Sequence, residues 1–317
     1  MNRISTVFPG QGVQKPGMGQ WLYDNFSSAK LLFEEVNDAL EMNLSNIMFC
    51  EEHIEQLKFT QNAQPAIMAV GMAALRVLAN DFGLKDFAYC TAGHSLGEYT
   101  ALIAAGMFSV QDGARLLQKR GLAMQSAVPA GVGGMLAVLG IDDITLIEKI
   151  AVTATEKAGL CEVANDNCPG QCVLSGYKAA LEFAGDLAKE NGAKKIVPLD
   201  VSVPSHCSLM APAAKALKAH IMECRANNIS IPLIQNYTAQ EEIDTSAIIN
   251  NLAAQITGRV RWRESILSIS SMKAHKIIEV GPGSVLKGLI KRTTPDIEVL
   301  SINSTVDLEC VATIISN

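Results

Sequence analysis

A chain of 317 residues can bury a large core, and its hydrophobic content of 49% excludes an intrinsically disordered protein. The formal net charge of −6 argues against a nucleic-acid-binding surface, which needs a basic footprint. The longest apolar stretch, residues 101–108, is far shorter than the roughly 20 residues that span a bilayer, and the N-terminus lacks the apolar run of a signal peptide. We therefore expect a cytoplasmic globular protein with no membrane or nucleic-acid partner.

Eight cysteines are scattered along the chain. Disulfide frameworks are typical of short secreted domains, so these cysteines indicate reduced thiols in the cytosol. Cys168 and Cys172 are the pair nearest to metal-ligand spacing, but neither a second pair nor paired histidines accompany them. We expect no metal site.

The first 130 residues alternate predicted strands and helices. A buried strand at residues 4–8 runs into the turn Pro9-Gly10-Gln11-Gly12, where glycine permits close backbone approach. Beyond it, apolar residues recur at helical spacing in several segments. The elements expected here are helices at 21–40 and 66–82, a central strand at 87–92, and helices at 98–107 and 110–127.

Residues 131–203 have a different rhythm. Expected strands lie at 134–139, 161–164, 171–175 and 195–201, expected helices at 142–158 and 179–191, and an Asn-Asp-Asn-Cys-Pro-Gly turn joins the second and third strands. This βαββαβ order is the split unit of ferredoxin-like domains. We therefore expect an α/β core formed by residues 1–130 and 204–317, with a ferredoxin-like small domain of residues 131–203 inserted in it.

The second part of the core begins at Pro204. A buried strand at 276–280 ends in Gly281-Pro282-Gly283, and a helix is expected to follow it. The other elements expected here are helices at 211–227, 245–255 and 262–272 and a strand at 232–236.

The strongest chemical signal is the motif Gly93-His94-Ser95-Leu96-Gly97. It lies between a predicted strand and a predicted helix, which is the context that a nucleophile elbow requires. The glycines avoid Cβ clashes in a sharp turn, and the helix N-terminus favours negative charge that develops beside the serine. The motif predicts that Ser95 is an activated nucleophile; a structural strand-to-helix turn is the alternative.

A serine needs a base to take its proton. Of the five histidines, His94 is a neighbour of Ser95 on a sharp turn and points away from it, and three others lie in charged or helical segments. His206 lies in the loop Val203-Pro204-Ser205-His206-Cys207, where catalytic groups are common, so we expect His206 to be the base. Glu241, Glu242 and Asp244 are the downstream acids, and none stands out as the group that orients the imidazole.

These residues resemble the malonyl-CoA:acyl carrier protein transacylase family over nearly the whole chain. Seven segments occur in the family's order, and together they make coincidence implausible. They are residues 8–12, 64–66 and 93–98, Arg120-Gly121 with Met124-Gln125, Asn165 with Asn167-x-Pro169-Gly170-Gln171, and residues 203–206 and 280–283. The family fold is a hydrolase-like α/β core with a parallel sheet and an inserted ferredoxin-like domain.

The resemblance implies a role for each matching position. Ser95 would form the acyl-enzyme, with His206 as its base. Backbone N–H groups of Gln11 and Leu96 would form the oxyanion hole, and the backbone carbonyl of Gln255 would orient the histidine. Substrate-binding positions would be Arg120, Gln64, Asn165 and Asn167. No cofactor beyond the coenzyme A thioester substrate is implied.

Arg120 carries the argument on substrate class. A pocket for apolar acyl chains would not bury a guanidinium, whereas the planar fork of arginine matches a carboxylate in a bidentate manner. We therefore expect Arg120 to bind the free carboxylate of a malonyl group; a solvated arginine beside Lys119 is the alternative.

The expected function is malonyl transfer from malonyl-CoA to the phosphopantetheine thiol of acyl carrier protein, by a ping-pong mechanism that supplies fatty acid biosynthesis. The expected partners are malonyl-CoA and acyl carrier protein, and the chain is expected to be a monomer. The alternatives are a trans-acting acyltransferase of a polyketide or polyunsaturated-lipid synthase, a serine thioesterase or esterase, and a catalytically silent carrier-binding module.

Overall fold

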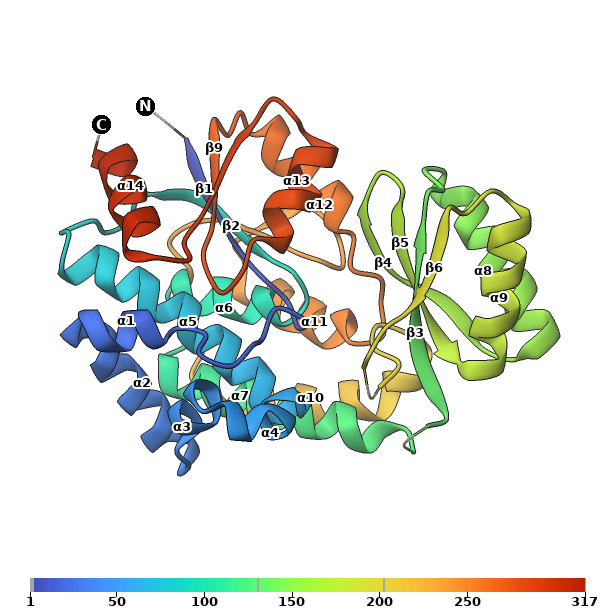
Figure 1. Cartoon of the computed structure of the whole chain (residues 1–317), viewed down its shortest axis with the longest axis horizontal. Coiled ribbons are helices and arrows are strands. Elements are labelled where there is room, and N and C mark those ends of the chain that lie inside the picture. The colour runs from blue at the N-terminus through green and yellow to red at the C-terminus, as the bar shows by residue number, and fades with distance from the viewer. Residues whose placement is uncertain (1–2, 130, 202, 317) are drawn as a thin grey trace.

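The computed structural model describes residues 3–129, 131–201 and 203–316, and its strands form two separate sheets (Figure 1). The larger sheet has the strand order β10-β9-β1-β2-β7-β8 and is parallel except for its last pair. Its strands are β1 (Ile4–Phe8), β2 (Ala88–Gly93), β7 (Leu233–Ile234), β8 (Glu241–Glu242), β9 (Lys276–Glu279) and β10 (Glu298–Ser301). The predicted α/β core with a parallel sheet is confirmed.

The register of the two central strands positions two functional loops. Phe8 at the end of β1 pairs with Gly93 at the end of β2, and the N–H of His94 donates to the carbonyl of Phe8 over 2.9 Å. Because parallel strands end at the same edge of the sheet, the loop that contains Gln11 and the turn that contains Ser95 leave the sheet side by side.

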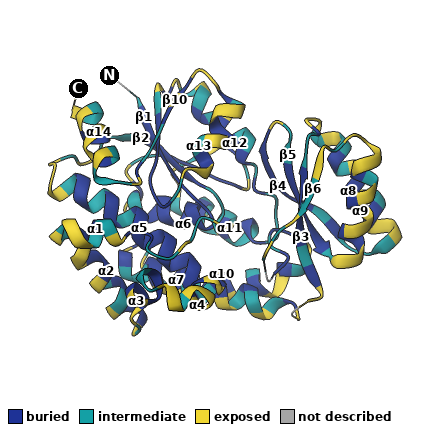
Figure 2. Cartoon of the chain, viewed as in Figure 1, coloured by how far each residue is buried: buried dark blue, intermediate teal, exposed yellow. Residues whose placement is uncertain are grey.

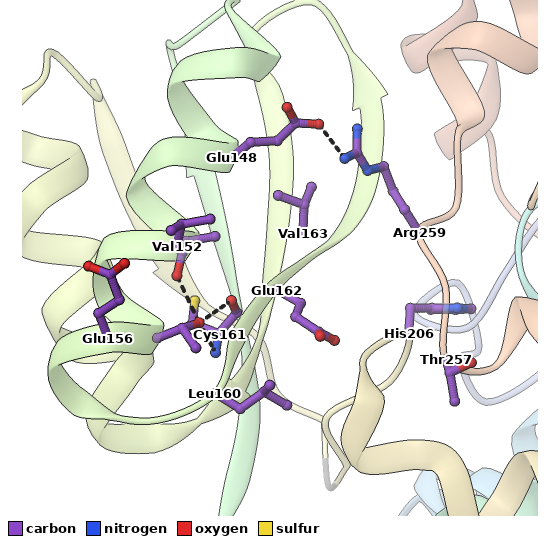
Figure 3. A pocket seen from close by; sticks show the side chains of 12 residues that line it. Glu148, Val152, Glu156, Leu160, Cys161, Glu162, Val163, His206, Thr257 and Arg259 are labelled. Atoms are coloured by element: carbon purple, nitrogen blue, oxygen red, sulfur yellow. Dashed lines mark hydrogen bonds and ion pairs between the residues drawn. The ribbon is translucent and has the colours of Figure 1, made fainter.

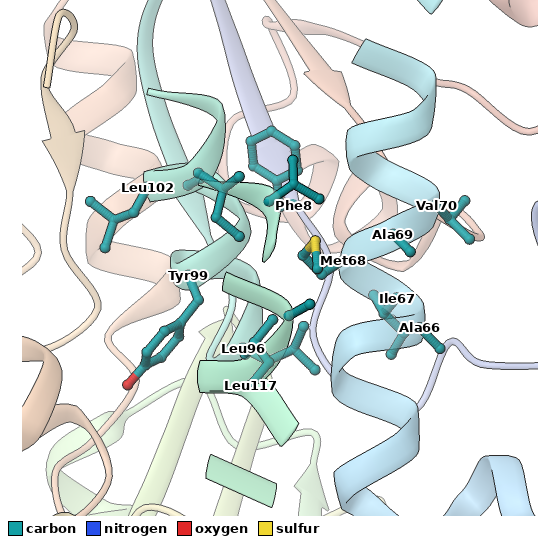
Figure 4. Close-up of a cluster of buried hydrophobic side chains, with 14 of the residues drawn as sticks. Phe8, Ala66, Ile67, Met68, Ala69, Val70, Leu96, Tyr99, Leu102 and Leu117 are labelled. Atoms are coloured by element: carbon teal, nitrogen blue, oxygen red, sulfur yellow. The ribbon is translucent and has the colours of Figure 1, made fainter. Parts of the chain in front are cut away.

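Helices cover both faces of this sheet (Figure 1). Phe8, Met68, Leu102 and Leu117 belong to one buried cluster that joins β1 to three helices (Figure 4). The helices of the core are α1 (Gln20–Asn25), α2 (Ser27–Leu40), α3 (Leu44–Phe49), α4 (Ile54–Lys58), α5 (Thr60–Asn80), α6 (Leu96–Ala104), α7 (Val110–Ala127), α10 (Ala211–Glu223), α11 (Thr245–Gln255), α12 (Trp262–Ser271), α13 (Val285–Thr293) and α14 (Thr305–Ser316).

Helix α5 corrects the expectation that residues 101–108 form the longest apolar stretch. Its 21 residues are long and apolar enough, by length and composition, to cross a membrane. However, 78% of its apolar window is buried inside the protein, where it packs against α2, α6 and α7 (Figure 2). The apolar residues of α5 are therefore explained by its position as a buried helix of the core.

The smaller sheet is antiparallel, with the order β4-β5-β3-β6. Its elements follow one another as β3 (Gly133–Leu139), α8 (Ile144–Ala158), β4 (Cys161–Cys168), β5 (Gln171–Tyr177), α9 (Lys178–Glu190) and β6 (Lys195–Pro198). This is the predicted βαββαβ unit, with both helices on one face (Figure 1). The boundaries at 130/131 and 203/204 stay predictions, and residue 130 lies outside the described residues.

The outer edge of β4 attaches this unit to the core. The N–H of Val260 donates to the carbonyl of Ala164 over 2.8 Å, and the N–H of Asp166 donates to the carbonyl of Val260 over 3.0 Å. The buried carboxylate of Asp166 also pairs with Arg263 at 2.7 Å. A short continuation of the sheet and an ion pair therefore hold the two parts together.

Several local expectations were wrong. The predicted helix at 21–40 is interrupted at Phe26, whose extended backbone (φ −132°, ψ 117°) separates α1 from α2. The predicted turn beginning at Asn165 is mostly strand, because β4 continues to Cys168 and only Pro169 and Gly170 make the turn. The short elements α3, α4, β8 and β10 and the last helix, α14, were not expected at all.

Candidate active site

Ser95 occupies a strained turn between β2 and α6. Its backbone has φ 54° and ψ −109°, an unfavourable conformation for a side chain with a Cβ atom. The motif glycines make the turn possible: a Cβ on Gly97 would lie 2.1 Å from the carbonyl oxygen of Phe8, and one on Gly93 would lie 1.9 Å from the backbone of Gly97. The local geometry is that of a nucleophile elbow.

Asn236, which follows β7, holds this turn in place by two hydrogen bonds. Its Oδ1 accepts from the N–H of Ser95 over 2.7 Å, and its Nδ2 donates to the carbonyl of Gly93 over 2.6 Å. The side chain is fully buried. One amide thus satisfies a donor and an acceptor that the sharp turn leaves without strand partners. The sequence contains no signal for this residue, because a lone asparagine after a strand matches no motif.

His206 lies against the serine hydroxyl. Its Nε2 is 2.8 Å from Ser95 Oγ, and its Nδ1 is 2.8 Å from the backbone oxygen of Gln255. A carbonyl can only accept, so Nδ1 carries the proton and Nε2 is left to accept from the serine hydroxyl. Burial, and next the positive charge of Arg120, lower the pKa of His206 to about 3, so the imidazole is neutral at physiological pH.

The adjacent histidine, His94, has a different environment. Its Nε2 is 2.9 Å from Asn167 Oδ1, and its ring meets Trp262 edge-on at 5.5 Å between ring centroids. Burial lowers the pKa of His94 as well. The side chain therefore contacts the small sheet and the core rather than the serine hydroxyl, as expected for a neighbour on a sharp turn.

Arg120, on α7, reaches the same hydroxyl from the other side. Its guanidinium donates from Nη2 to Ser95 Oγ over 3.1 Å and to Gln255 Oε1 over 3.1 Å, and from Nη1 to Gln64 Oε1 over 2.8 Å. The side chain is only 1% exposed, which rules out the solvated arginine. No ion pair of Arg120 is found within the described residues, so a buried cation has no anionic partner beside it.

Gln64 has a different place from the one expected. It is fully buried beneath the guanidinium and does not line the cavity at the serine. Its side-chain oxygen accepts from Arg120. The structure therefore makes Gln64 a support for Arg120 rather than a wall of the binding site.

A cavity of about 200 Å³ opens over the serine between the two sheets. The residues expected at the site that line it are Gln11, Ser95, Leu96, Arg120, Asn165, Asn167 and His206. Its remaining wall is largely apolar, with Met135, Val173, Leu199 and Val201 from the small domain and Leu289 from α13. An apolar channel that ends at a buried cation and a hydroxyl suits an extended acyl thioester with a terminal negative charge.

A second cavity of about 470 Å³ lies on the other side of His206, against α8 and β4 (Figure 3). Glu148 and Arg259 form an ion pair across its rim. Neither Ser95 nor Arg120 lines it, so the smaller cavity is the candidate reaction site. In the described part of the chain, no cluster of three or more histidine, cysteine or acidic side chains is arranged to hold a metal.

Comparison with known proteins decides the family. Residues 6–309 match the model of the acyl transferase domain. The chain is 41% identical over 309 residues to the malonyl CoA-acyl carrier protein transacylase of Bacillus subtilis (strain 168), an alignment that covers 98% of this chain and 96% of that protein. The chain belongs to the malonyl-CoA:acyl carrier protein transacylase family.

Solved structures of this transacylase family have the same fold. The acyl-carrier-protein-S-malonyltransferase from Bartonella henselae superposes with a TM-score of 0.95 at 44% identity, covering 99% of this chain and 100% of that one. A malonyl-transacylase in complex with a type II PKS acyl-carrier protein superposes with a TM-score of 0.94 at 36% identity, covering 98% and 99% of the two chains. The chain is therefore an acyltransferase.

Proposed function

We propose that the chain transfers a malonyl group from malonyl-CoA to the phosphopantetheine thiol of acyl carrier protein, through a malonyl ester on Ser95. The observation that supports this proposal is the position of the Ser95 hydroxyl between His206 Nε2 at 2.8 Å and Arg120 Nη2 at 3.1 Å. A neutral imidazole on one side and a buried guanidinium on the other combine a base with a binding site for a carboxylate.

The first half-reaction forms the acyl-enzyme. His206 Nε2 takes the hydroxyl proton as Ser95 Oγ attacks the thioester carbonyl, and backbone N–H groups of Gln11 and Leu96 receive the oxyanion. The intermediate collapses with cleavage of the carbon–sulfur bond, and the imidazolium returns its proton to the leaving thiolate of coenzyme A. The N-terminus of α6 directly after Ser95 adds a favourable potential for the oxyanion.

The second half-reaction repeats these steps with the carrier thiol as nucleophile. His206 takes the thiol proton, the thiolate attacks the malonyl ester, and Ser95 Oγ leaves and recovers the proton. A carboxylate bound at Arg120 offsets the positive charge that helps to lower the pKa of His206, so the imidazole becomes a stronger base once the substrate is bound. No step requires a metal or redox cofactor.

Several broader assignments belong to the same proposal. We assign the core to residues 1–130 and 204–317 and the small domain to residues 131–203, and place the enzyme in the cytoplasm as a monomer that supplies fatty acid biosynthesis. Relatives named malonyl CoA-acyl carrier protein transacylase support the carrier. The type II PKS carrier bound by one similar enzyme supports polyketide synthesis as the second candidate.

The test is a transfer assay with malonyl-CoA and holo acyl carrier protein, followed by mass spectrometry of the carrier. The expected result is a malonyl group on the holo carrier and none on the apo carrier, which lacks the thiol. Kinetics at several concentrations of both substrates should give the parallel double-reciprocal lines of a ping-pong reaction. Sustained hydrolysis of malonyl-CoA without transfer would establish a thioesterase instead.

A further inference from the structure

The buried carboxylate of Glu98 is a feature that the proposed reaction does not use. Glu98 lies on α6, three residues after the nucleophile, and is 1% exposed. Its Oε2 accepts from Gln255 Nε2 over 2.6 Å and from the N–H of Asn236 over 3.3 Å. Among the described residues no cation forms an ion pair with it. A buried acid without a direct counter-ion is costly, so its position calls for an explanation.

The Gln255 side chain connects this acid to Arg120. Its amide oxygen accepts from Arg120 Nη2 over 3.1 Å, and its amide nitrogen donates to Glu98 Oε2 over 2.6 Å and to the backbone oxygen of Ser95 over 2.9 Å. The two buried opposite charges are thus linked by one neutral amide. Burial dominates both groups: it raises the pKa of Glu98 to about 7 and lowers the pKa of Arg120. The opposite charges act against burial, because Arg120 lowers the pKa of Glu98 and Glu98 raises that of Arg120.

The orientation of that amide matters for the substrate. An amide has an accepting end and a donating end, and the opposite orientation would place the NH2 group of Gln255 against the NH2 groups of Arg120. Glu98 Oε2 and the backbone oxygen of Ser95 both accept from the amide nitrogen, so together they favour the orientation in which the Gln255 oxygen faces the guanidinium. A direct ion pair between Glu98 and Arg120 would achieve charge balance too, but it would occupy the donors that a substrate carboxylate needs.

We propose that Glu98 is a positioning residue for acyl selection, which acts through the Gln255 amide to hold the Arg120 guanidinium ready for the substrate carboxylate. This inference rests on the proposed function. Loss of Glu98 removes the shorter of two hydrogen bonds from the Gln255 amide nitrogen, at 2.6 Å, and leaves the one to the Ser95 backbone oxygen at 2.9 Å. The amide is then held less firmly, and so is the oxygen that orients Arg120. Transfer of a malonyl group should suffer, whereas transfer of an acetyl group, which carries no carboxylate, should change little.

A purely structural role for Glu98 predicts a different result. If the carboxylate only supports the turn under Ser95, its loss should slow every acyl transfer by the same factor. The ratio of malonyl to acetyl transfer distinguishes the two roles. Because both rates come from one preparation, the ratio does not depend on the fraction of the protein that is folded.

The experiment measures kcat and KM for malonyl-CoA and for acetyl-CoA with holo acyl carrier protein, in the wild type, Glu98→Ala and Glu98→Gln. The control is Thr100→Val, a near-isosteric change at a buried position of the same helix, whose hydroxyl has no hydrogen-bond partner among the residues that the structure describes. A hydrogen bond to a charged group is worth about 10- to 100-fold in rate, so Glu98→Ala should lower the malonyl-to-acetyl ratio of kcat/KM by about that factor.

Glu98→Gln keeps an oxygen that can accept from Gln255, so its ratio should fall by less than about tenfold, and Thr100→Val should keep the wild-type ratio. A ratio for Glu98→Ala within about threefold of the wild type would overturn the inference, whether both rates fall together or neither falls. If the wild type itself transfers no malonyl group, the proposed function fails; if it does and the Glu98→Ala ratio is unchanged, only the present inference fails.

Discussion

Replacement of Arg120 by alanine tests the substrate class. The guanidinium is buried and forms no direct ion pair in the described part of the chain, so two of its N–H groups can turn toward a substrate carboxylate. Hydrogen bonds between charged groups contribute about 1.5–3 kcal/mol each, so two of them contribute about 3–6 kcal/mol. At about 1.4 kcal/mol per tenfold change, Arg120→Ala should lower kcat/KM for malonyl-CoA by about 10²- to 10⁴-fold.

Acetyl transfer should be much less sensitive to this change. An acetyl group has no carboxylate, so the only bond to a reacting group that the variant loses is the one from Arg120 to Ser95 Oγ. A bond from a charged donor is worth at least about 1.5 kcal/mol, or roughly tenfold in rate. Both rates can be measured by mass spectrometry of the loaded carrier. Lys119→Ala is the matched control, because the preceding side chain on α7 is 42% exposed and pairs with Glu223 at the surface. Equal losses for malonyl and acetyl transfer would refute the carboxylate-binding role.

Two further predictions concern the residues beneath the nucleophile. Asn236→Ala removes both hydrogen bonds that hold the turn, so we expect a lower melting temperature and equal losses of malonyl and acetyl transfer, of about tenfold or more; an unchanged melting curve would contradict this. Burial raises the pKa of Glu98 from 4.5 to about 7. Between these pH values the folded protein keeps a proton that the unfolded chain releases, so the free energy of unfolding falls as pH rises from 4.5 to 7. Urea unfolding at both pH values should show a smaller decline in the free energy of unfolding for Glu98→Gln than for the wild type. Equal declines would contradict a raised pKa for the buried Glu98 carboxyl.

The sequence predicts the parts of this protein that depend on local patterns. The helix at 110–127 has the expected bounds because Ser109 caps its N-terminus and its apolar residues recur at helical spacing. The elbow was predictable because backbone crowding allows only glycine at two positions of the motif. Short segments such as β8 and β10 carry too few residues to show a period, so their pairing depends on the neighbouring strand.

The candidate site was predictable only in part, for a related reason. Ser95 and His206 are 111 residues apart, and the sequence alone favoured His206 as the base only by its position in a loop, with the family resemblance assigning it the same role. The side chains of Asn236 and Gln255 orient the site by hydrogen bonds across the fold, and isolated amides leave no pattern in a sequence. Gln64 was expected to bind substrate, whereas its side chain lies beneath Arg120, a position set by packing that composition does not reveal.

Intact-mass spectrometry after incubation with malonyl-CoA, without a carrier, tests most directly whether Ser95 forms the acyl-enzyme. The wild type should gain one malonyl group, because the ester has no acceptor thiol to attack it. Ser95→Ala should gain none, and addition of holo acyl carrier protein should remove the group from the wild type. A malonyl adduct on both proteins, or on neither, would contradict the mechanism.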